Sequence, residues 1–199
     1  MLSTKAKSLL TLVAVISTVT MGCSSTSDSS SAAVSIPGFQ EGATMVTLVN
    51  MHPDPKRKIL YAVNYQLAGG MIPMCAEVKI EDIGSKEIEF NYNGMTYTYL
   101  WDKHTRNAGE SLMQNISNFI GPKCDKNKVS SLSAKDQAGI QSGKPSVGMT
   151  KEGILFAMGR PPIHANPSLD GSTWMYWLNK FKKQAIDFDN NGKVKEVRL

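Results

Sequence analysis

The stretch IEFNYNGMTYTYL, residues 88–100, decides the fold of the first half of this chain. The Asn-Gly pair at positions 93 and 94 is the preferred centre of a type I′ turn, whose twist matches that of the strands it joins. With a two-residue turn, position 92 faces 95, 90 faces 97 and 88 faces 99, so aliphatic and aromatic side chains share one side. The other side is polar. The sequence therefore predicts a hairpin whose register is fixed by its apolar face.

Strand-like segments precede this hairpin. Residues 76–83 alternate between apolar and charged side chains, as expected of a half-buried strand. Two further β-rich runs, residues 45–51 and 59–65, are separated by residues 52–58, whose two prolines indicate a loop. The basic residues 56–58 in that loop are predicted to be solvated, with contact to acidic lipid headgroups as the alternative.

A helix is predicted after the hairpin, because apolar residues recur at helical spacing at positions 112, 116 and 119 or 120. The Gly-Pro pair at positions 121 and 122 is a stop signal. Five short strands and one helix within residues 38–126 predict a small SH3-like β domain, either a barrel or a curled sheet.

Two helices followed by three strands are predicted for residues 133–199. The first helix begins at Ser133 and ends at Gly143, and the second begins at Thr150 and ends at Gly159. The strands are predicted at residues 173–179, 184–188 and 194–199, with a turn at 189–192 between the last two. Helices on an antiparallel meander form a two-layer domain, so the whole chain is assigned to the α+β class.

The strand at residues 173–179 carries large apolar side chains on both faces. Trp174 and Tyr176 point one way, and Met175 and Trp177 point the other. Only one face can lie under the helices, so the second needs a cover, either the N-terminal domain or a partner protein. Met175 and Trp177 are therefore candidate partner-binding residues.

Four short motifs occur in order in the C-terminal third of the chain. They are Gly148-Met149-Thr150-Lys151-Glu152, Gly159-Arg160-Pro161, Trp174-Met175-Tyr176, and Phe188-Asp189 followed by Gly192 and Val194. With these motifs, residues 133–199 resemble the SmpA/OmlA (BamE-like) lipoprotein domain. The resemblance implies a two-layer ααβββ fold, an outer-membrane location and contacts with envelope or outer-membrane assembly proteins. Because residues 38–126 form a domain that the family's best-known member lacks, a role in barrel assembly does not follow from it.

The first 22 residues are predicted to be a signal peptide. Lys5 and Lys7 precede an apolar run of 11 residues, too short to span a membrane, and Gly22 precedes Cys23. This resembles the bacterial lipobox, although Thr20 stands where the family usually has an aliphatic residue. The resemblance implies that Cys23 is acylated, with palmitate as a suitable probe, and anchors the chain in a bilayer. An ordinary cleaved leader is the alternative.

The residues that follow Cys23 are predicted to be a tether. Residues 23–37 are rich in serine and cannot bury a core. In the usual sorting rule for such lipoproteins, an aspartate after the cysteine retains the protein at the inner membrane. Ser24 stands there, so the outer membrane is favoured, with the protein facing the periplasm.

Two cysteines remain, Cys75 and Cys124. In an oxidising compartment an even pair predicts a disulfide, and two buried free thiols are the alternative.

No residue pattern in this chain predicts catalysis, a cofactor or a metal. There is no G-x-S-x-G motif, and the three histidines show no metal-binding spacing. Residues 187–192 imitate the start of a calcium loop, but Arg198 occupies the position that requires a bidentate glutamate. The formal charge of +5 falls to +3 without the two leader lysines, and nucleic acid is not an expected partner.

The sequence thus predicts a non-catalytic protein-binding or scaffold module in envelope or outer-membrane protein assembly. The alternative is a periplasmic binding module for peptidoglycan, a peptide or another small ligand.

Overall fold

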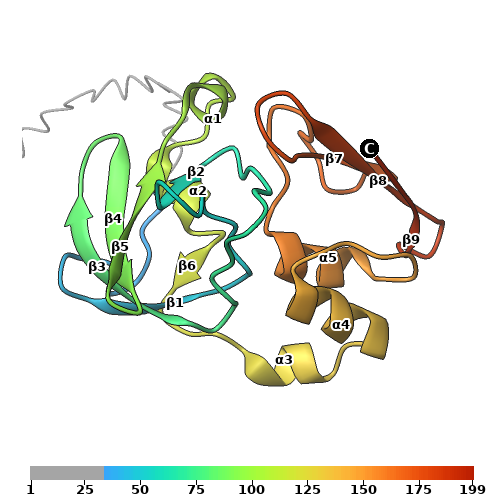
Figure 1. The fold of residues 1–199 in the computed structure, drawn as a ribbon, viewed down its shortest axis with the longest axis horizontal. Coiled ribbons are helices and arrows are strands. Elements are labelled where there is room, and N and C mark those ends of the chain that lie inside the picture. Colours follow the sequence, from blue (N-terminus) through green and yellow to red (C-terminus); the bar gives the residue numbers. More distant parts are fainter. Residues whose placement is uncertain (1–33) are drawn as a thin grey trace, which may run out of the picture. The chain divides into compact units, whose positions relative to one another are not determined.

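The computed structural model describes residues 34–199, which contain two β-sheets and five helices (Figure 1). The predicted signal peptide, Cys23 and most of the predicted tether lie outside the described residues. The α+β class is confirmed: a curled six-stranded sheet is followed by helices and a three-stranded sheet.

The hairpin is confirmed with its predicted register. Strand β4 (Glu87–Tyr92) pairs antiparallel with β5 (Met95–Leu100), and position 92 faces 95, 90 faces 97 and 88 faces 99. Both turn residues have left-handed backbone, with φ of 51° at Asn93 and 77° at Gly94, as a type I′ turn requires.

The larger sheet has the order β2-β5-β4-β3-β1-β6. All its neighbours are antiparallel except β2 and β5. The remaining strands are β1 (Thr44–Thr47), β2 (Ile59–Tyr61), β3 (Glu77–Ile83) and β6 (Ile120–Gly121). The alternation predicted for β3 is confirmed, because Val78 and Ile80 are buried. An SH3-like arrangement is not confirmed by this strand order.

The helix predicted over positions 112–120 is shorter in the structure. Helix α2 (Leu112–Ile116) begins with a capping box between Ser111 and Gln114. The chain then turns, and Ile120 and Gly121 pair with β1 as strand β6. Because Ile120 is fully buried in the strand, its apolar character did not distinguish a helix from a strand. Helix α1 (Lys103–Asn107), which lies before α2, was not predicted.

The two predicted C-terminal helices are confirmed with their caps. Helix α4 (Ala134–Ser142) begins after Ser133 and ends at Gly143. Helix α5 (Lys151–Met158) begins after Thr150 and ends at Gly159. A short helix, α3 (Lys126–Ser130), precedes them and was not predicted.

The smaller sheet has the order β7-β8-β9, formed by β7 (Thr173–Trp177), β8 (Lys183–Phe188) and β9 (Val194–Arg198). It agrees with the predicted meander. Its inner face packs on α5, where Trp174, Tyr176 and Ile186 form a core with Ile154 and Met158. This is the two-layer arrangement expected from the sequence.

Residues 34–199 belong to one compact unit. Ile36, two residues before the predicted start of the β domain, is already buried in the core of the larger sheet. The division into domains at residues 38–126 and 133–199 stays a prediction.

Candidate binding site at the junction of the two sheets

Four side chains from residues 50–66 reach the C-terminal ends of helices α4 and α5. The last carbonyl groups of an α-helix have no partner within the helix, so they require donors from elsewhere. The donors here are the side chains of Asn50, His52, Asn64 and Gln66. We call these four side chains, with the carbonyl groups they bind, the polar junction.

Asn50 occupies the centre of the polar junction and is 1% exposed. Its Nδ2 donates to the carbonyl oxygens of Ile140, at 2.6 Å, and Ala157, at 3.4 Å. Its Oδ1 accepts from the backbone N–H of Met74 at 2.8 Å. One amide group thus joins α4, α5 and the segment that leads into β3.

Asn64 and Gln66 bind the end of α5 one residue further on. Asn64 Nδ2 donates to the carbonyl oxygens of Met158 and Arg160, both at 2.8 Å. Gln66 Nε2 donates to Met158 as well, at 2.9 Å. Asn64 has a φ of 57°, a conformation that asparagine tolerates better than most residues.

The buried carboxylate of Glu110 forms a second contact between the first half of the chain and the segment that follows α5. Glu110, which is 8% exposed, accepts from Arg160 Nη1 at 3.2 Å and from Asn115 Nδ2 at 2.6 Å. Asn115 in turn accepts from the hydroxyl of Tyr99, whose pKa burial raises well above its ordinary value. Arg160 belongs to one of the four family motifs, so this network ties the motif to the larger sheet.

A cavity of about 810 Å³ opens beside the polar junction. It lies between residues 66–71, the end of α4 and the turn between β7 and β8. Its walls are mainly apolar, with Leu67, Met71 and Leu178 among the lining residues. We call it the junction cavity. Its size is within the range of small-molecule binding sites.

Polar groups of three kinds reach the junction cavity. Lys144 and Lys182 line it as exposed cations. Gln66 Oε1 is buried and accepts no hydrogen bond in the described structure. His52 Nε2 lies 3.1 Å from the carbonyl oxygen of Ala157. A carbonyl only accepts, so Nε2 carries the proton and Nδ1 of the neutral ring is left as an acceptor.

Burial lowers the pKa of His52 below its ordinary value of 6.5, against the smaller opposite effect of its hydrogen bond to Ala157. The unfolded chain therefore takes up the proton at a higher pH than the folded chain. The contribution of His52 to the free energy of unfolding is complete above about pH 6.5 and is lost as the pH falls toward the folded-state pKa.

We expect the unfolding midpoint to decrease on acidification from pH 7 to 5, and His52→Gln to reduce that decrease. Urea unfolding at each pH measures the midpoints. An equal decrease in midpoint from pH 7 to 5 in the wild-type protein and in His52→Gln would contradict the prediction.

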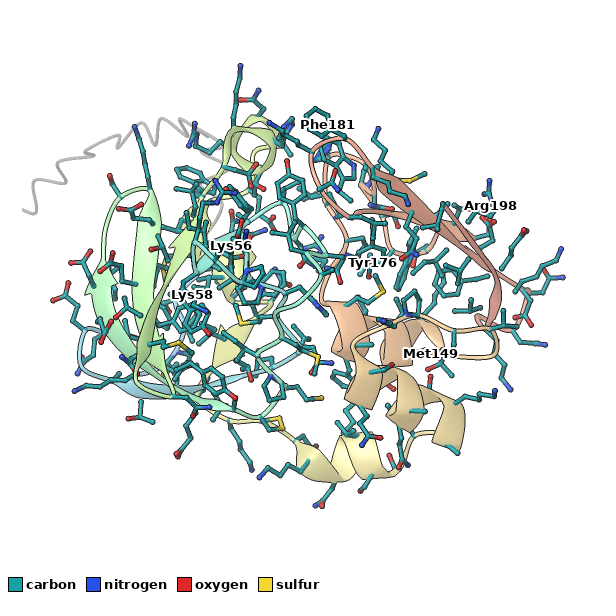
Figure 2. All side chains as sticks on the ribbon, in the orientation of Figure 1. Lys56, Lys58, Met149, Tyr176, Phe181 and Arg198 are labelled. Atoms are coloured by element: carbon teal, nitrogen blue, oxygen red, sulfur yellow. A yellow bond between two sulfur atoms is a disulfide. The ribbon has the colours of Figure 1, made fainter. Side chains whose placement is uncertain are left out.

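The two predicted disulfide cysteines are brought together. Cys75 and Cys124 form a disulfide with a Cα–Cα distance of 5.3 Å, which Figure 2 shows as a yellow bond. Cys75 lies two residues before β3, and Cys124 follows β6. Because β1 pairs with both of these strands, the disulfide links the two neighbours of one strand.

Met175 and Trp177, the candidate partner-binding residues, are both half-buried. Trp177 packs against Tyr65, His104 and His164, with ring centroids 6.1, 5.1 and 4.9 Å away. Tyr65 and His104 belong to the first half of the chain, so that half partly covers the outer face of β7. Of the two covers that the sequence analysis considered, the N-terminal domain and a partner protein, the structure shows the first.

Phe181 was not predicted as a functional residue. It is 86% exposed on the turn between β7 and β8, where Figure 2 labels it. Three lysines flank it in the sequence Lys180-Phe181-Lys182-Lys183. An isolated phenylalanine within a run of lysines is a sequence signal that could have identified it.

Within residues 34–199, no three histidine, cysteine, aspartate or glutamate side chains lie close enough to hold a metal ion. The helices of this part of the chain include none that is long and apolar enough to cross a membrane.

Residues 143–198 match the family described as the outer membrane protein assembly factor BamE domain. The match confirms, for this C-terminal part, the family resemblance predicted from the four motifs. No curated protein and no solved structure matches the chain. The α5 carbonyl groups of the polar junction lie inside the matched residues, whereas all four donor side chains lie outside them.

Proposed function

We propose that this protein is a lipid-anchored lipoprotein of the outer membrane that faces the periplasm and acts as a non-catalytic protein-binding scaffold in envelope or outer-membrane protein assembly. The match of residues 143–198 to the BamE domain carries this proposal, because the name of that family describes an outer membrane protein assembly factor.

The disulfide supports export from the cytoplasm. Disulfides persist in oxidising compartments such as the bacterial periplasm, and the bond between Cys75 and Cys124 suits that location. The proposed site of lipid attachment is Cys23, which follows the predicted signal peptide.

The protein-binding surface of the proposal centres on Phe181, on the turn between β7 and β8, and includes the half-buried side chains of Met175 and Trp177 on β7. Asn179 Oδ1 accepts from the backbone N–H groups of Phe181, at 2.9 Å, and Lys182, at 3.0 Å, so the turn is locally ordered. An exposed aromatic side chain on an ordered turn loses little conformational entropy when it binds. Aromatic residues of this kind carry much of the binding energy of protein interfaces.

Co-purification tests the proposed role. A tagged full chain, isolated from cross-linked envelopes, is expected to capture subunits of the outer-membrane assembly machinery. Phe181→Ala should reduce the captured amount about tenfold, because a central aromatic contact contributes roughly 1.4 kcal/mol or more. Met95→Ala, an exposed apolar position on the larger sheet, is the matched control and should capture the wild-type amount. Capture of cell-wall fragments instead of assembly subunits would contradict the scaffold role.

The same preparations test the anchor. Radiolabelled palmitate is expected to enter the wild-type chain and not Cys23→Ser, which should accumulate as an unlipidated precursor. Palmitate in the Cys23→Ser protein would contradict the anchor assignment.

A further inference from the structure

The scaffold role makes no use of the junction cavity. We propose that this cavity binds a short apolar peptide that has a free carboxylate. The inference rests on the shape and chemistry of the cavity alone, so it is independent of the proposed role in assembly.

The walls and size of the cavity favour an apolar ligand with side chains. The volume of about 810 Å³ suits a ligand of three or four residues, and Leu67, Met71 and Leu178 provide apolar contacts. These residues come from two segments that are far apart in the sequence, one before β3 and one after β7. A ligand held between them contacts both halves of the described structure.

One buried polar atom of the lining residues, Gln66 Oε1, lacks a hydrogen-bond donor, and this favours a ligand that donates. Gln66 Oε1 accepts no hydrogen bond, and its Nε2 is already engaged with Asn64 and Met158. The neutral ring of His52, another lining residue, leaves Nδ1 as a second acceptor for a ligand, although this atom is not itself buried without a partner. A buried acceptor without a partner costs about 1–3 kcal/mol, so a ligand that donates relieves an existing penalty. Backbone N–H groups of a peptide supply such donors, whereas the carboxylate of an ionised fatty acid supplies none.

The charge of the lining favours an anionic group. Lys144 and Lys182 are among the lining residues, and no aspartate or glutamate is. Lys144 follows the C-terminus of α4, and Lys182 lies on the turn between β7 and β8, so they approach the cavity from different elements. A carboxylate at the end of an apolar peptide places its charge beside these lysines while the side chains occupy the apolar walls.

Calorimetric titration of the full chain in phosphatidylcholine nanodiscs tests this, with empty nanodiscs as the blank. The probes are acetyl-trileucine with a free carboxylate, its C-terminal amide and sodium laurate. We expect acetyl-trileucine to bind, the amide to bind about tenfold more weakly, and laurate to bind more weakly than the peptide.

Charge-reversal variants locate the site. Lys144→Glu with Lys182→Glu should weaken acetyl-trileucine binding about tenfold, since each exposed ion pair contributes only a few-fold in affinity. Lys86→Glu with Lys135→Glu makes the same change in net charge at exposed positions outside the cavity lining, and should leave binding unchanged. All four lysines are exposed, so both variants should unfold at the wild-type temperature, which circular dichroism checks.

Three outcomes would overturn the proposal: no binding of acetyl-trileucine at millimolar concentration, equal affinities for the carboxylate and the amide, or equal effects of the two charge-reversal variants. Tighter binding of laurate than of the peptide would also overturn it and would assign the cavity to a lipid. None of these outcomes affects the co-purification result.

Discussion

Loss of the disulfide between Cys75 and Cys124 is expected to lower the free energy of unfolding by about 4 kcal/mol, because the bond closes a loop of roughly 50 residues in the unfolded chain. That loop contains most of the larger sheet and helices α1 and α2. Without the bond, the unfolded chain gains conformational freedom while the native strands keep their hydrogen bonds. Urea unfolding of the double variant Cys75→Ser and Cys124→Ser measures the change.

Reduction of the wild-type protein is the matched experiment, since it breaks the same bond without changing a side chain elsewhere. The reduced wild-type protein and the double variant should unfold at similar urea concentrations, well below that of the oxidised protein. Non-reducing electrophoresis confirms the oxidation state of each sample, because the oxidised chain migrates faster. A double variant as stable as the oxidised wild type would show that the bond does not stabilise the fold.

Replacement of Asn50 by leucine is expected to lower the free energy of unfolding by about 3 kcal/mol. The variant leaves the buried N–H group of Met74 without its partner. It also removes the shorter of two hydrogen bonds to the carbonyl oxygen of Ile140, which keeps the backbone N–H of Gly143 at 3.2 Å. A buried N–H group without a partner costs about 1–3 kcal/mol, and the lost hydrogen bond to Ile140 adds about 1 kcal/mol. Ala157 keeps a second partner in His52, so its carbonyl oxygen adds little to the loss.

Asn107→Leu is the control for this variant, because Asn107 is an exposed asparagine at the end of α1. A surface change of this kind should alter stability by less than about 0.5 kcal/mol. Denaturant unfolding of both variants gives the comparison. Equal losses in the two proteins would mean that the polar junction contributes no more to stability than an exposed side chain.

Features of the fold that depend on neighbouring residues were predictable from the sequence. The hairpin register follows from Asn93-Gly94 and the alternation of side chains on either side of it. The ends of α4 and α5 follow from Ser133, Gly143, Thr150 and Gly159, which act on the backbone within a few residues. The disulfide followed from the two cysteines that remain once Cys23 is assigned to the anchor, and from the expected compartment.

Short elements and distant contacts were not predictable. Helices α1 and α3 have five residues each, too few to show a period, and β6 has two. The donors and acceptors that join Asn50 and His52 to α4 and α5 are 90 to 107 positions apart. No local pattern marks Asn50 as the partner of a helix end, so the polar junction and its cavity were found only from the structure.

The long sequence separation across the polar junction also determines when the ends of α4 and α5 can be completed. The hairpin β4–β5 needs only adjacent residues, so it can form as soon as residues 87–100 are available. Asn50 cannot make both of its helix contacts until residue 157 is available to fold with it. Contacts between residues so far apart in the sequence form late, and they slow the overall folding rate. Most of the chain must therefore be present before the end of the last helix gains these partners, and until then the side chains of Asn50, Asn64 and Gln66 lack the carbonyl groups that they bind.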